Sequence, residues 1–338
     1  MKSKFFISIF VIVVVAIATV ALVQKKSSGP QRMYKVGILA RGASATYMSS
    51  IEGFKKKMAA LGYTEGETVT YDIRIVDAKE DLPKAVDAFI AASVDLIHTY
   101  STPATQAAYK ATRNLPAPIP IVFGSLGDPL NAGVVKNIQR PDTNVTGVAS
   151  LSTELTAKRL ELLRDVDPAV KRVAVPRSTA ELNDAASLRS IEIATETAAR
   201  LGIELVLYPV RSADEHAAVA KEITRTEVDG IIIPADSLIF AGISHYVAQS
   251  LKEKLPLAGF DITQVEGGAL VGFGPDYETM GEQSALLAHQ ILRGRSPAVI
   301  AVEVPKKLLL MLNQKTARAI GIAFPDALVR SADVVIDE

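Results

Sequence analysis

The segment KVGILARGASATYMSSIEGFKKKMAALGY, residues 35–63, decides the fold class. It begins with a short apolar run over residues 35–40, passes through a loop of small residues, and ends in an amphipathic stretch over residues 46–61. A buried strand that leads through a tight loop into a helix is the repeating unit of a parallel sheet covered by helices. This segment therefore predicts an α/β protein.

The same alternation continues in two series along the chain. The first contains further apolar, β-branched runs, each expected to be a strand, at residues 68–76, 94–99, 119–123 and 144–149. The second begins after Ser150 and contains such runs at residues 172–176, 203–209, 230–234, 257–260 and 270–274. Helical periodicity fills the intervals at residues 82–92, 103–113, 152–165, 181–201, 213–226, 237–254 and 276–293. The two series predict two doubly wound parallel-sheet lobes, which agrees with a length of 338 residues.

The connection between the two series is direct. No long stretch rich in Pro, Gly or Ser separates them, so we expect the chain to cross between the lobes near residues 149–152 and again near residues 274–276. Short crossings of this kind act as a hinge. Parallel sheets bind ligands outside the carboxyl ends of their strands, so two facing lobes predict one crevice lined by the loops after each strand.

The composition excludes several classes of function. Lys and Arg together number 37, as do Asp and Glu, so no basic surplus favours nucleic acid. The chain has no cysteine, which excludes a lipid-anchored cysteine, disulfides, thiolate metal sites and a cysteine nucleophile. Phosphate-loop and dinucleotide motifs are missing, and no histidine pair has metal-ligand spacing. We therefore expect neither a cofactor nor a metal.

The first thirty residues have the layout of an export signal. Lys2 and Lys4 precede an uncharged apolar run over residues 5–23, and a polar stretch follows at residues 24–30. The apolar run is about as long as the roughly twenty residues that span a bilayer. Residues 1–30 are therefore expected to be either a cleaved signal peptide or a retained signal anchor plus linker, and the protein to be periplasmic or otherwise extracytoplasmic.

The loop after the first predicted strand contains Ser44, Thr46 and Tyr47. A strand that runs into a serine and then a helix resembles the nucleophile elbow of hydrolases, but Thr46 stands where that motif requires its last glycine. The four histidines of the chain lie within a predicted strand or in predicted helices. Ser44 and Thr46 are therefore expected to cap a helix and donate hydrogen bonds rather than to catalyse.

Further polar loops follow the later strands. The loop Tyr100, Ser101, Thr102, Pro103, Ala104, Thr105 is a strong helix start, whose free N–H groups either hold a carboxylate or simply begin a helix. The turn at residues 124–129 contains Gly127 and Asp128. In the second series Asp236 and Asp261 follow strands, where each either pairs with a ligand amine or caps a helix. Aromatic residues gather at the same strand ends, which favours a crevice that stacks on a flat or apolar solute.

Three segments carry a family resemblance: GFKKKMAALGYTEGETV, GDPLNAGVVKNIQRPDTNVTGV, and the C-terminal segment VEVPKKLLLMLNQKTARAIGIAFPDALVRSADVVID. Together they resemble the ABC-transporter substrate-binding proteins, a family that includes tryptophan- and tyrosine-type periplasmic receptors. The resemblance runs from about residue 33 to the C-terminus. It implies a type I periplasmic-binding-protein fold without catalytic activity, with residues 34–150 and 275–298 in the N-terminal lobe and residues 151–274 and 299–338 in the C-terminal lobe.

The resemblance also implies site residues. The loop Ser101–Thr105, the turn at Gly127 and Asp128, and Tyr277 match segments that contact the solute in the family. Where the family carries an Asn-Pro turn, this chain has Pro176, Arg177, Ser178 and Thr179, so the identity of the solute is left open. Arg177 either faces an acidic ligand or is solvated.

The sequence thus predicts the extracytoplasmic solute-binding component of an ABC importer. The protein is expected to be a monomer that captures a small carboxylated ligand, such as an aromatic or branched amino acid, by hinge closure and delivers it to a membrane permease. A membrane-anchored ligand-sensing or scaffold protein of the same fold is the alternative. An enzyme on a doubly wound fold is a third interpretation, which the missing catalytic motifs disfavour.

Overall fold

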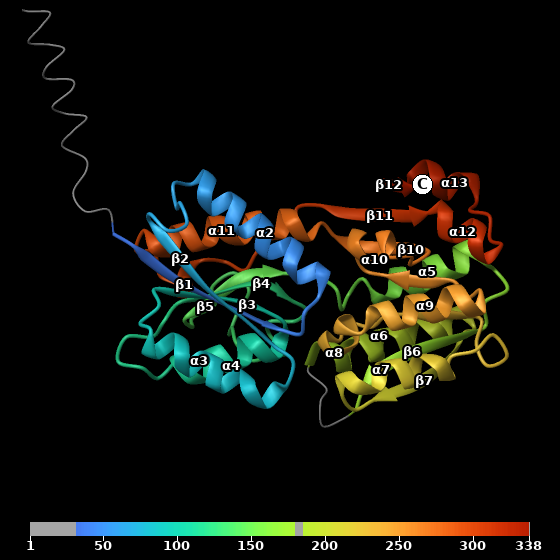
Figure 1. Ribbon diagram of the computed structural model, residues 1–338, viewed down its shortest axis with the longest axis horizontal. Helices are drawn as coiled ribbons and strands as arrows, with labels where there is room; N and C mark the ends of the chain where they lie inside the picture. Colours follow the sequence, from blue (N-terminus) through green and yellow to red (C-terminus); the bar gives the residue numbers. More distant parts are fainter. Residues whose placement is uncertain (1–31, 180–184, 338) are drawn as a thin grey trace, which may run out of the picture.

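The computed structural model describes residues 32–179 and 185–337. The predicted export segment lies outside the described residues. The described chain forms two lobes side by side, each a sheet with helices on both faces (Figure 1). The prediction of an α/β protein with two lobes is confirmed.

The N-terminal lobe is built on a five-stranded sheet in the order β2-β1-β3-β4-β5, and every pair in it is parallel. Its strands are β1 (Tyr34–Arg41), β2 (Val69–Val76), β3 (Leu96–Tyr100), β4 (Ile121–Leu126) and β5 (Val145–Ala149). The helices α2 (Ala45–Ala60) and α11 (Tyr277–Leu292) cover one face, and α3 (Leu82–Ala91) and α4 (Thr102–Thr112) cover the other (Figure 1). β3 and β4 are buried along their whole length, as strands covered on both faces must be.

The C-terminal lobe is built on a seven-stranded sheet in the order β12-β11-β10-β9-β8-β6-β7. Its strands are β6 (Arg172–Ser178), β7 (Glu204–Val210), β8 (Gly230–Ile232), β9 (Leu257–Gly259), β10 (Val271–Pro275), β11 (Leu308–Asn313) and β12 (Val334–Ile336). Only the β10–β11 pair among them is antiparallel.

Helices also cover both faces of this second sheet. They are α5 (Thr156–Val166), α6 (Ala185–Leu201), α7 (His216–Glu222), α8 (Ser237–Ala241), α9 (Ile243–Glu253), α10 (Ile262–Glu266), α12 (Gln314–Ile320) and α13 (Asp326–Ser331). Apolar residues of α5, α6 and α12 pack with one core cluster of the sheet, and those of α7, α8 and α9 pack with another. The strands therefore hold their carboxyl ends in fixed positions.

Three segments connect the lobes. β5 leads through residues 150–155 into α5, and β10 leads through Asp276 into α11. The third runs from Glu303, whose backbone pairs with Gly147 and Ala149, to the start of β11 at Leu308. Residues up to 303 thus lie beside the five-stranded sheet, although the sequence-based ranges place the C-terminal lobe from residue 299.

Two predicted helices differ from the structure. The predicted helix over residues 237–254 is divided into α8 and α9 at Gly242, where an added Cβ would lie 2.3 Å from the ring of His216. The predicted helix over residues 213–226 is a single 3-10 turn followed by the short α7. A tertiary contact at Gly242 and a 3-10 turn at residues 213–215 thus interrupt patterns that are helical in sequence.

Candidate functional site

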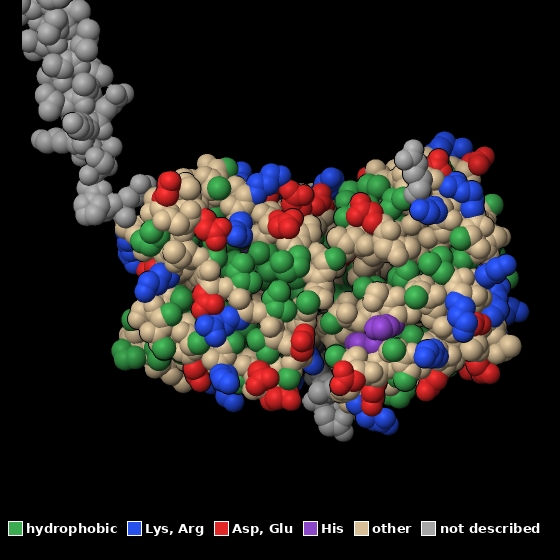
Figure 2. Space-filling model, in the orientation of Figure 1, with side chains coloured by type: hydrophobic (Ala, Val, Ile, Leu, Met, Phe, Trp, Pro, Cys, Tyr) green, Lys and Arg blue, Asp and Glu red, His purple; other side chains and the backbone are tan. Residues whose placement is uncertain are grey.

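A pocket lies between the lobes where the strand ends of both sheets meet. In this arrangement of the lobes it is almost closed: its cavity has a volume of about 20 Å³, far below the range of about 300–1,000 Å³ typical of small-molecule sites. Figure 2 shows the lobes meeting along a narrow seam on the face drawn. The residues that line the pocket come from both lobes: Tyr47, Ser101, Thr102, Ser125, Leu126, Gly127, Ser152, Ala186, Ala235, Ser237 and Phe240.

Neutral groups dominate this lining. Five Ser or Thr hydroxyls and the hydroxyl of Tyr47 provide its polar atoms, and the rings of Tyr47 and Phe240 provide flat apolar surface. Phe240 is supported by Phe260, with the ring centroids 4.6 Å apart in an edge-to-face arrangement. The pocket is therefore suited to a small solute with an apolar or aromatic part and several hydrogen-bonding atoms.

The loop at Ser101 is held in an unusual conformation. Ser101 has φ 84° and ψ 154°, a region that side chains rarely adopt. Its N–H donates to the carbonyl of Ser125 at 3.0 Å, and its hydroxyl accepts from the N–H of Ala104 at 3.4 Å. Thr105 donates to the carbonyl of Ser101 at 2.9 Å. Ala104 and Thr105 thus shape the loop, while Ser101 and Thr102 reach the pocket.

The loop after β1 is shaped in a similar way. Ser44 caps α2 by accepting a hydrogen bond from the N–H of Tyr47 at 3.3 Å. This cap places the ring of Tyr47 against the pocket and 5.7 Å from the ring of Tyr100. Tyr100 is fully buried beneath it, and burial raises the pKa of its hydroxyl. Ser44 and Tyr100 therefore position Tyr47.

The two predicted acidic residues of the C-terminal lobe are buried and engaged by protein donors. The carboxylate of Asp236 accepts from the N–H and hydroxyl of Ser178 at 3.0 and 2.5 Å, and from the hydroxyl of Ser187 at 2.7 Å. It also caps α8 through the N–H of Leu238 at 3.0 Å. Asp236 thereby holds its neighbour Ser237 against the pocket.

Asp261 joins the lobes. Its Oδ2 accepts from the hydroxyl of Thr46 at 2.5 Å, and its Oδ1 accepts from the hydroxyl of Thr263 at 2.8 Å and the N–H of Gln264 at 3.1 Å. Burial raises the pKa of Asp261 above its usual value, which these hydrogen bonds oppose. In this arrangement Thr46 and Asp261 bind each other.

Gly127 lies at a close approach between the lobes. A Cβ added there would lie 2.9 Å from the Cβ of Ala186 and 2.7 Å from Oγ1 of Thr153. The neighbouring Asp128 turns away from the pocket and accepts from the side-chain amide of Asn131 at 2.6 Å. Only a residue without a side chain fits at position 127 while the lobes are in contact.

Tyr277 follows the second crossing and is buried at the first turn of α11. Burial raises the pKa of its hydroxyl, and the nearby cation of Arg159 opposes that shift. It does not line the pocket. It therefore lies at the second crossing between the lobes and not on the pocket wall.

The structure thus brings four of the thirteen predicted site residues to the pocket wall: Tyr47, Ser101, Thr102 and Gly127. The others lie around it: Ser44, Thr46, Tyr100, Ala104, Thr105, Asp128, Asp236, Asp261 and Tyr277. The remaining lining residues were not among the predicted ligand contacts, although Phe240 is one of the aromatic residues expected at the crevice, and Ser125, Leu126, Ala235 and Ser237 belong to loops identified in the sequence. For the residues in those loops, the useful signal in the sequence is their position after a strand and not their residue type.

Two arginines are buried near the seam. Arg159 of α5 is fully buried, stacks 3.5 Å above the ring of Phe260, and donates to the carbonyls of Ser152 and Phe273 and to the hydroxyl of Thr156. Burial lowers its pKa to about 9. Because Ser152 and Phe273 lie on two segments that run between the lobes, Arg159 ties these segments together.

Arg41, at the end of β1, is the second. It is 4 % exposed, and its Nη1 donates to the hydroxyl of Ser237 at 3.4 Å. It also lines a neighbouring interlobe cavity of about 330 Å³, together with residues 77–80, residues 211–214 and Leu238. Neither buried arginine is within 4 Å of a carboxylate among the described residues.

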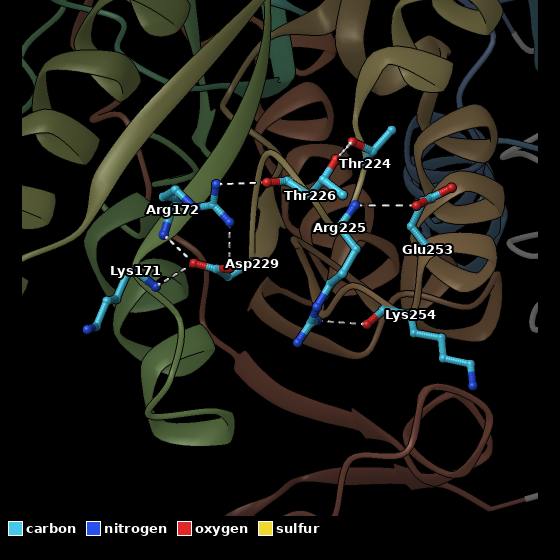
Figure 3. Close-up of polar contacts among 8 residues, drawn as sticks. All are labelled: Lys171, Arg172, Thr224, Arg225, Thr226, Asp229, Glu253 and Lys254. Carbon is cyan, nitrogen blue, oxygen red and sulfur yellow. Dashed lines mark hydrogen bonds and ion pairs between the residues drawn. The ribbon is translucent and has the colours of Figure 1, made fainter.

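A larger surface hollow, of about 730 Å³, lies at the opposite end of the seven-stranded sheet. There Asp229 accepts from the backbone N–H groups of Lys171 and Arg172 at 3.1 and 2.8 Å and from the Arg172 side chain at 3.2 Å (Figure 3). Arg225 in turn donates to the carbonyl of Lys254 at 3.1 Å. These contacts fasten loops to the start of β6 and leave no polar group of Asp229 for a ligand.

Within residues 32–179 and 185–337, no helix is long and apolar enough to cross a membrane. The same described residues contain no group of three or more His, Asp or Glu side chains placed to hold a metal ion. The pocket between the lobes, lined by residues of both, is the candidate functional site.

Several known proteins are similar to this chain over most of its length. The chain is 27% identical over 304 residues to a tyrosine-binding protein of Clostridioides difficile, which covers 88% of this chain and 84% of that protein. A Streptococcus pneumoniae ABC domain in complex with L-Trp superposes with a TM-score of 0.80 at 25% identity, over 90% of this chain and 99% of the other. The ligand-free, open structure of a Clostridium difficile substrate-binding protein gives a TM-score of 0.62, also at 25% identity, over 90% and 100% of the two chains.

A family match covers nearly all of the described residues. Residues 35–336 match the family described as ABC transporter substrate binding protein. This span includes both sheets, the connecting segments and every residue that lines the pocket. The chain therefore belongs to the ABC transporter substrate binding protein family.

Proposed function

We propose that this chain captures a small carboxylated solute between its lobes and delivers it to the membrane permease of an ABC importer, outside the cytoplasm and as a monomer. The observation that carries this proposal is the pocket between the strand ends, to which both lobes contribute rings and hydroxyls. A site divided between two lobes binds its solute most fully when the lobes are together.

An amino acid with an aromatic or branched side chain is the class of solute that we propose. The rings of Tyr47 and Phe240 offer stacking surface, and the hydroxyls of Ser101, Thr102 and Ser237 offer partners for its polar atoms. A relative that is named as tyrosine-binding and a structural relative that holds L-Trp support this choice.

Hinge closure is the proposed mechanism. The three connecting segments are short, and the lobes touch through Thr46 and Asp261. At the same sequence identity, the chain superposes better on the tryptophan complex than on the ligand-free open structure, with TM-scores of 0.80 and 0.62. This difference supports a bound-like arrangement of the lobes here and an open one before the solute arrives.

Binding without chemical conversion fits the residues at the site. The hydroxyls of the pocket wall have no histidine among the described lining residues to act as a general base. His98, a buried histidine of the N-terminal lobe, shares a hydrogen bond of 2.9 Å between its Nε2 and the hydroxyl of Ser284 in α11. We therefore propose that the solute leaves unchanged.

Native mass spectrometry of the purified protein, followed by calorimetric titration with L-tyrosine, L-tryptophan and L-leucine, tests the proposal. We expect one bound small molecule per chain, and loss of binding in Phe240→Ala. Phe324→Ala removes a buried ring of the C-terminal lobe that does not line the pocket, so it should destabilise the protein by a similar few kcal/mol and keep binding. Turnover of a bound solute, or equal binding loss in both variants, would contradict the proposal.

A further inference from the structure

Arg41 combines deep burial with very few partners. Its side chain is 4 % exposed, and its one hydrogen bond among the described residues joins Nη1 to the hydroxyl of Ser237 at 3.4 Å, near the limit of such a bond. Its Nε has no partner in the described part of the chain. An arginine carries five donors, so most of its hydrogen-bonding capacity is unused.

A buried cation in this condition is unfavourable for the folded protein, because its lost hydration is not replaced. Arg159 shows how the fold compensates such a residue elsewhere, since it has two carbonyls, one hydroxyl and the face of Phe260. Arg41 has no comparable set. A group that the protein itself does not satisfy is a candidate for satisfaction by a ligand.

The position of Arg41 fits that role. Ser237, which its guanidinium contacts, lines the pocket, and Arg41 itself lines the adjoining interlobe cavity. The pocket wall has only neutral polar groups, so a carboxylate held there would otherwise meet no positive charge. Because Arg41 belongs to the N-terminal lobe and Ser237 to the C-terminal lobe, this arrangement exists only with the lobes together.

The adjoining cavity limits the charge of the ligand. Its lining has three basic side chains, Arg41, Lys79 and Arg211, and three acidic ones, Asp77, Glu80 and Asp214. Because the basic and acidic side chains are equal in number, the cavity has no excess positive charge to bind a phosphate or a dicarboxylate. One guanidinium in reach of the pocket matches one carboxylate, which it can bind through two parallel hydrogen bonds.

We propose that Arg41 binds the carboxylate of the captured solute and makes the site selective for a single carboxylate over its neutral amide. This inference rests on the proposed function, because it assigns a group of the same solute. It adds a specificity-determining residue at the junction of the two interlobe cavities, in a loop where the sequence had drawn attention to Ser44, Thr46 and Tyr47.

Calorimetric titration with three matched pairs tests it: L-tyrosine and L-tyrosinamide, L-tryptophan and L-tryptophanamide, L-leucine and L-leucinamide. For any pair that binds, we expect wild type to prefer the acid by at least about thirtyfold, the effect of truncating a buried charge pair. Arg41→Met should lose that preference, and Arg41→Lys should keep part of it.

Arg211→Met is the matched control. Arg211 lines the same cavity but is 73% exposed and pairs with Glu215, so its removal should leave the preference for the acid unchanged. The melting temperature without ligand is a second measurement. It should not fall in Arg41→Met, since a poorly satisfied buried cation is removed, whereas loss of a structural arginine would lower it.

The outcomes separate the two proposals. If wild type binds none of the six compounds, the proposed function fails and this inference with it. If wild type binds acid and amide equally, or if Arg41→Met keeps the preference for the acid, the inference fails while solute capture stands. If Arg41→Met weakens acid and amide alike and melts several degrees lower, Arg41 is structural and the inference is again overturned.

Discussion

Thr46 and Asp261 lie on different lobes and share a buried hydrogen bond of 2.5 Å between Oγ1 and Oδ2. Thr46 lies in the first turn of α2, and Asp261 caps α10. Because each residue is fixed by its own helix, a rotation of one lobe away from the other breaks this bond before it disturbs either lobe. The bond is therefore a marker of contact between the lobes.

Thr46→Val should weaken solute binding by about tenfold. The variant removes a hydrogen bond to a buried carboxylate. That bond contributes about 1.5 kcal/mol or more, and it exists only when the lobes are together. Calorimetry measures the affinity. At one limiting concentration of solute, small-angle scattering should show a larger radius of gyration for Thr46→Val than for wild type, because less of the variant has its lobes together.

Thr263→Val is the control for Thr46→Val. Thr263 donates to the other oxygen of the same carboxylate at 2.8 Å but lies within the C-terminal lobe. Its loss should lower the free energy of unfolding and leave the affinity nearly unchanged. Equal loss of affinity in both variants would show that Asp261 stabilises its own lobe and does not join the two.

Gly127→Ala should weaken binding without destabilising either lobe. The added methyl would lie 2.9 Å from the Cβ of Ala186 across the seam, so the lobes must separate slightly to admit it. We expect a loss of affinity of tenfold or more by calorimetry, with an unchanged melting temperature for the ligand-free protein. The double variant Gly127→Ala with Ala186→Gly removes the contact across the seam but keeps the one with Oγ1 of Thr153 at 2.7 Å, so it should restore part of the affinity, and no gain over Gly127→Ala would contradict the steric explanation.

Ser101 should be replaced more easily by glycine than by alanine. Alanine loses the helix cap, at about 1 kcal/mol, and keeps a backbone conformation that is unfavourable for any side chain. Glycine loses the same cap but adopts this backbone conformation without strain. The free energy of unfolding of Ser101→Gly should therefore be higher than that of Ser101→Ala by about 1–3 kcal/mol. Urea denaturation of the two variants measures the difference, and equal stabilities would argue that the loop is unstrained.

Much of the fold could be predicted because the inner strands are covered on both faces. β3 and β4 are buried throughout, and each begins with consecutive apolar residues, Leu96 and Ile97 in β3 and residues 121–123 in β4, which mark a buried strand in the sequence. The tail after residue 300 also contains an unbroken apolar run, at residues 308–312, although no strand was predicted there. β11 and β12 gain their partners from strands far away in the chain, so their pairing depends on the assembled sheet and not on local sequence.

The site could be predicted only in part, because residue type indicates chemistry but not which partner a side chain finds. Asp236 and Ser101 follow strands alike, yet Asp236 is occupied by Ser178 and Ser187 while Ser101 lines the pocket. Arg159 had a signal in sequence, since it occupies the buried stripe of α5 with Thr156 and Leu163. The burial of Arg41 and its contact with Ser237 depend on the lobes being together, so no local sequence pattern could indicate them.

His98 should make the protein sensitive to mild acid. Burial lowers its pKa to about 3, whereas an unfolded histidine titrates near 6.5. Below pH 6.5 the unfolded chain binds a proton that the native protein does not, so the free energy of unfolding is fully retained above pH 6.5 and falls as the pH drops toward 3. At pH 5 the loss from this residue is about 2 kcal/mol.

Urea denaturation of wild type and His98→Gln at pH 7.5 and pH 5 measures this contribution. The variant should lose less stability between the two pH values than wild type does, even if it is less stable at both. His245→Gln, at an exposed position, should keep the wild-type difference.

The chemical shift of the His98 ring in wild type is an independent measurement that does not require the variant to fold. Because the ring packs 4.0 Å from Phe54 and bonds to Ser284, it should not titrate between pH 5 and 8, and a midpoint near 6.5 would show that His98 does not cause the sensitivity.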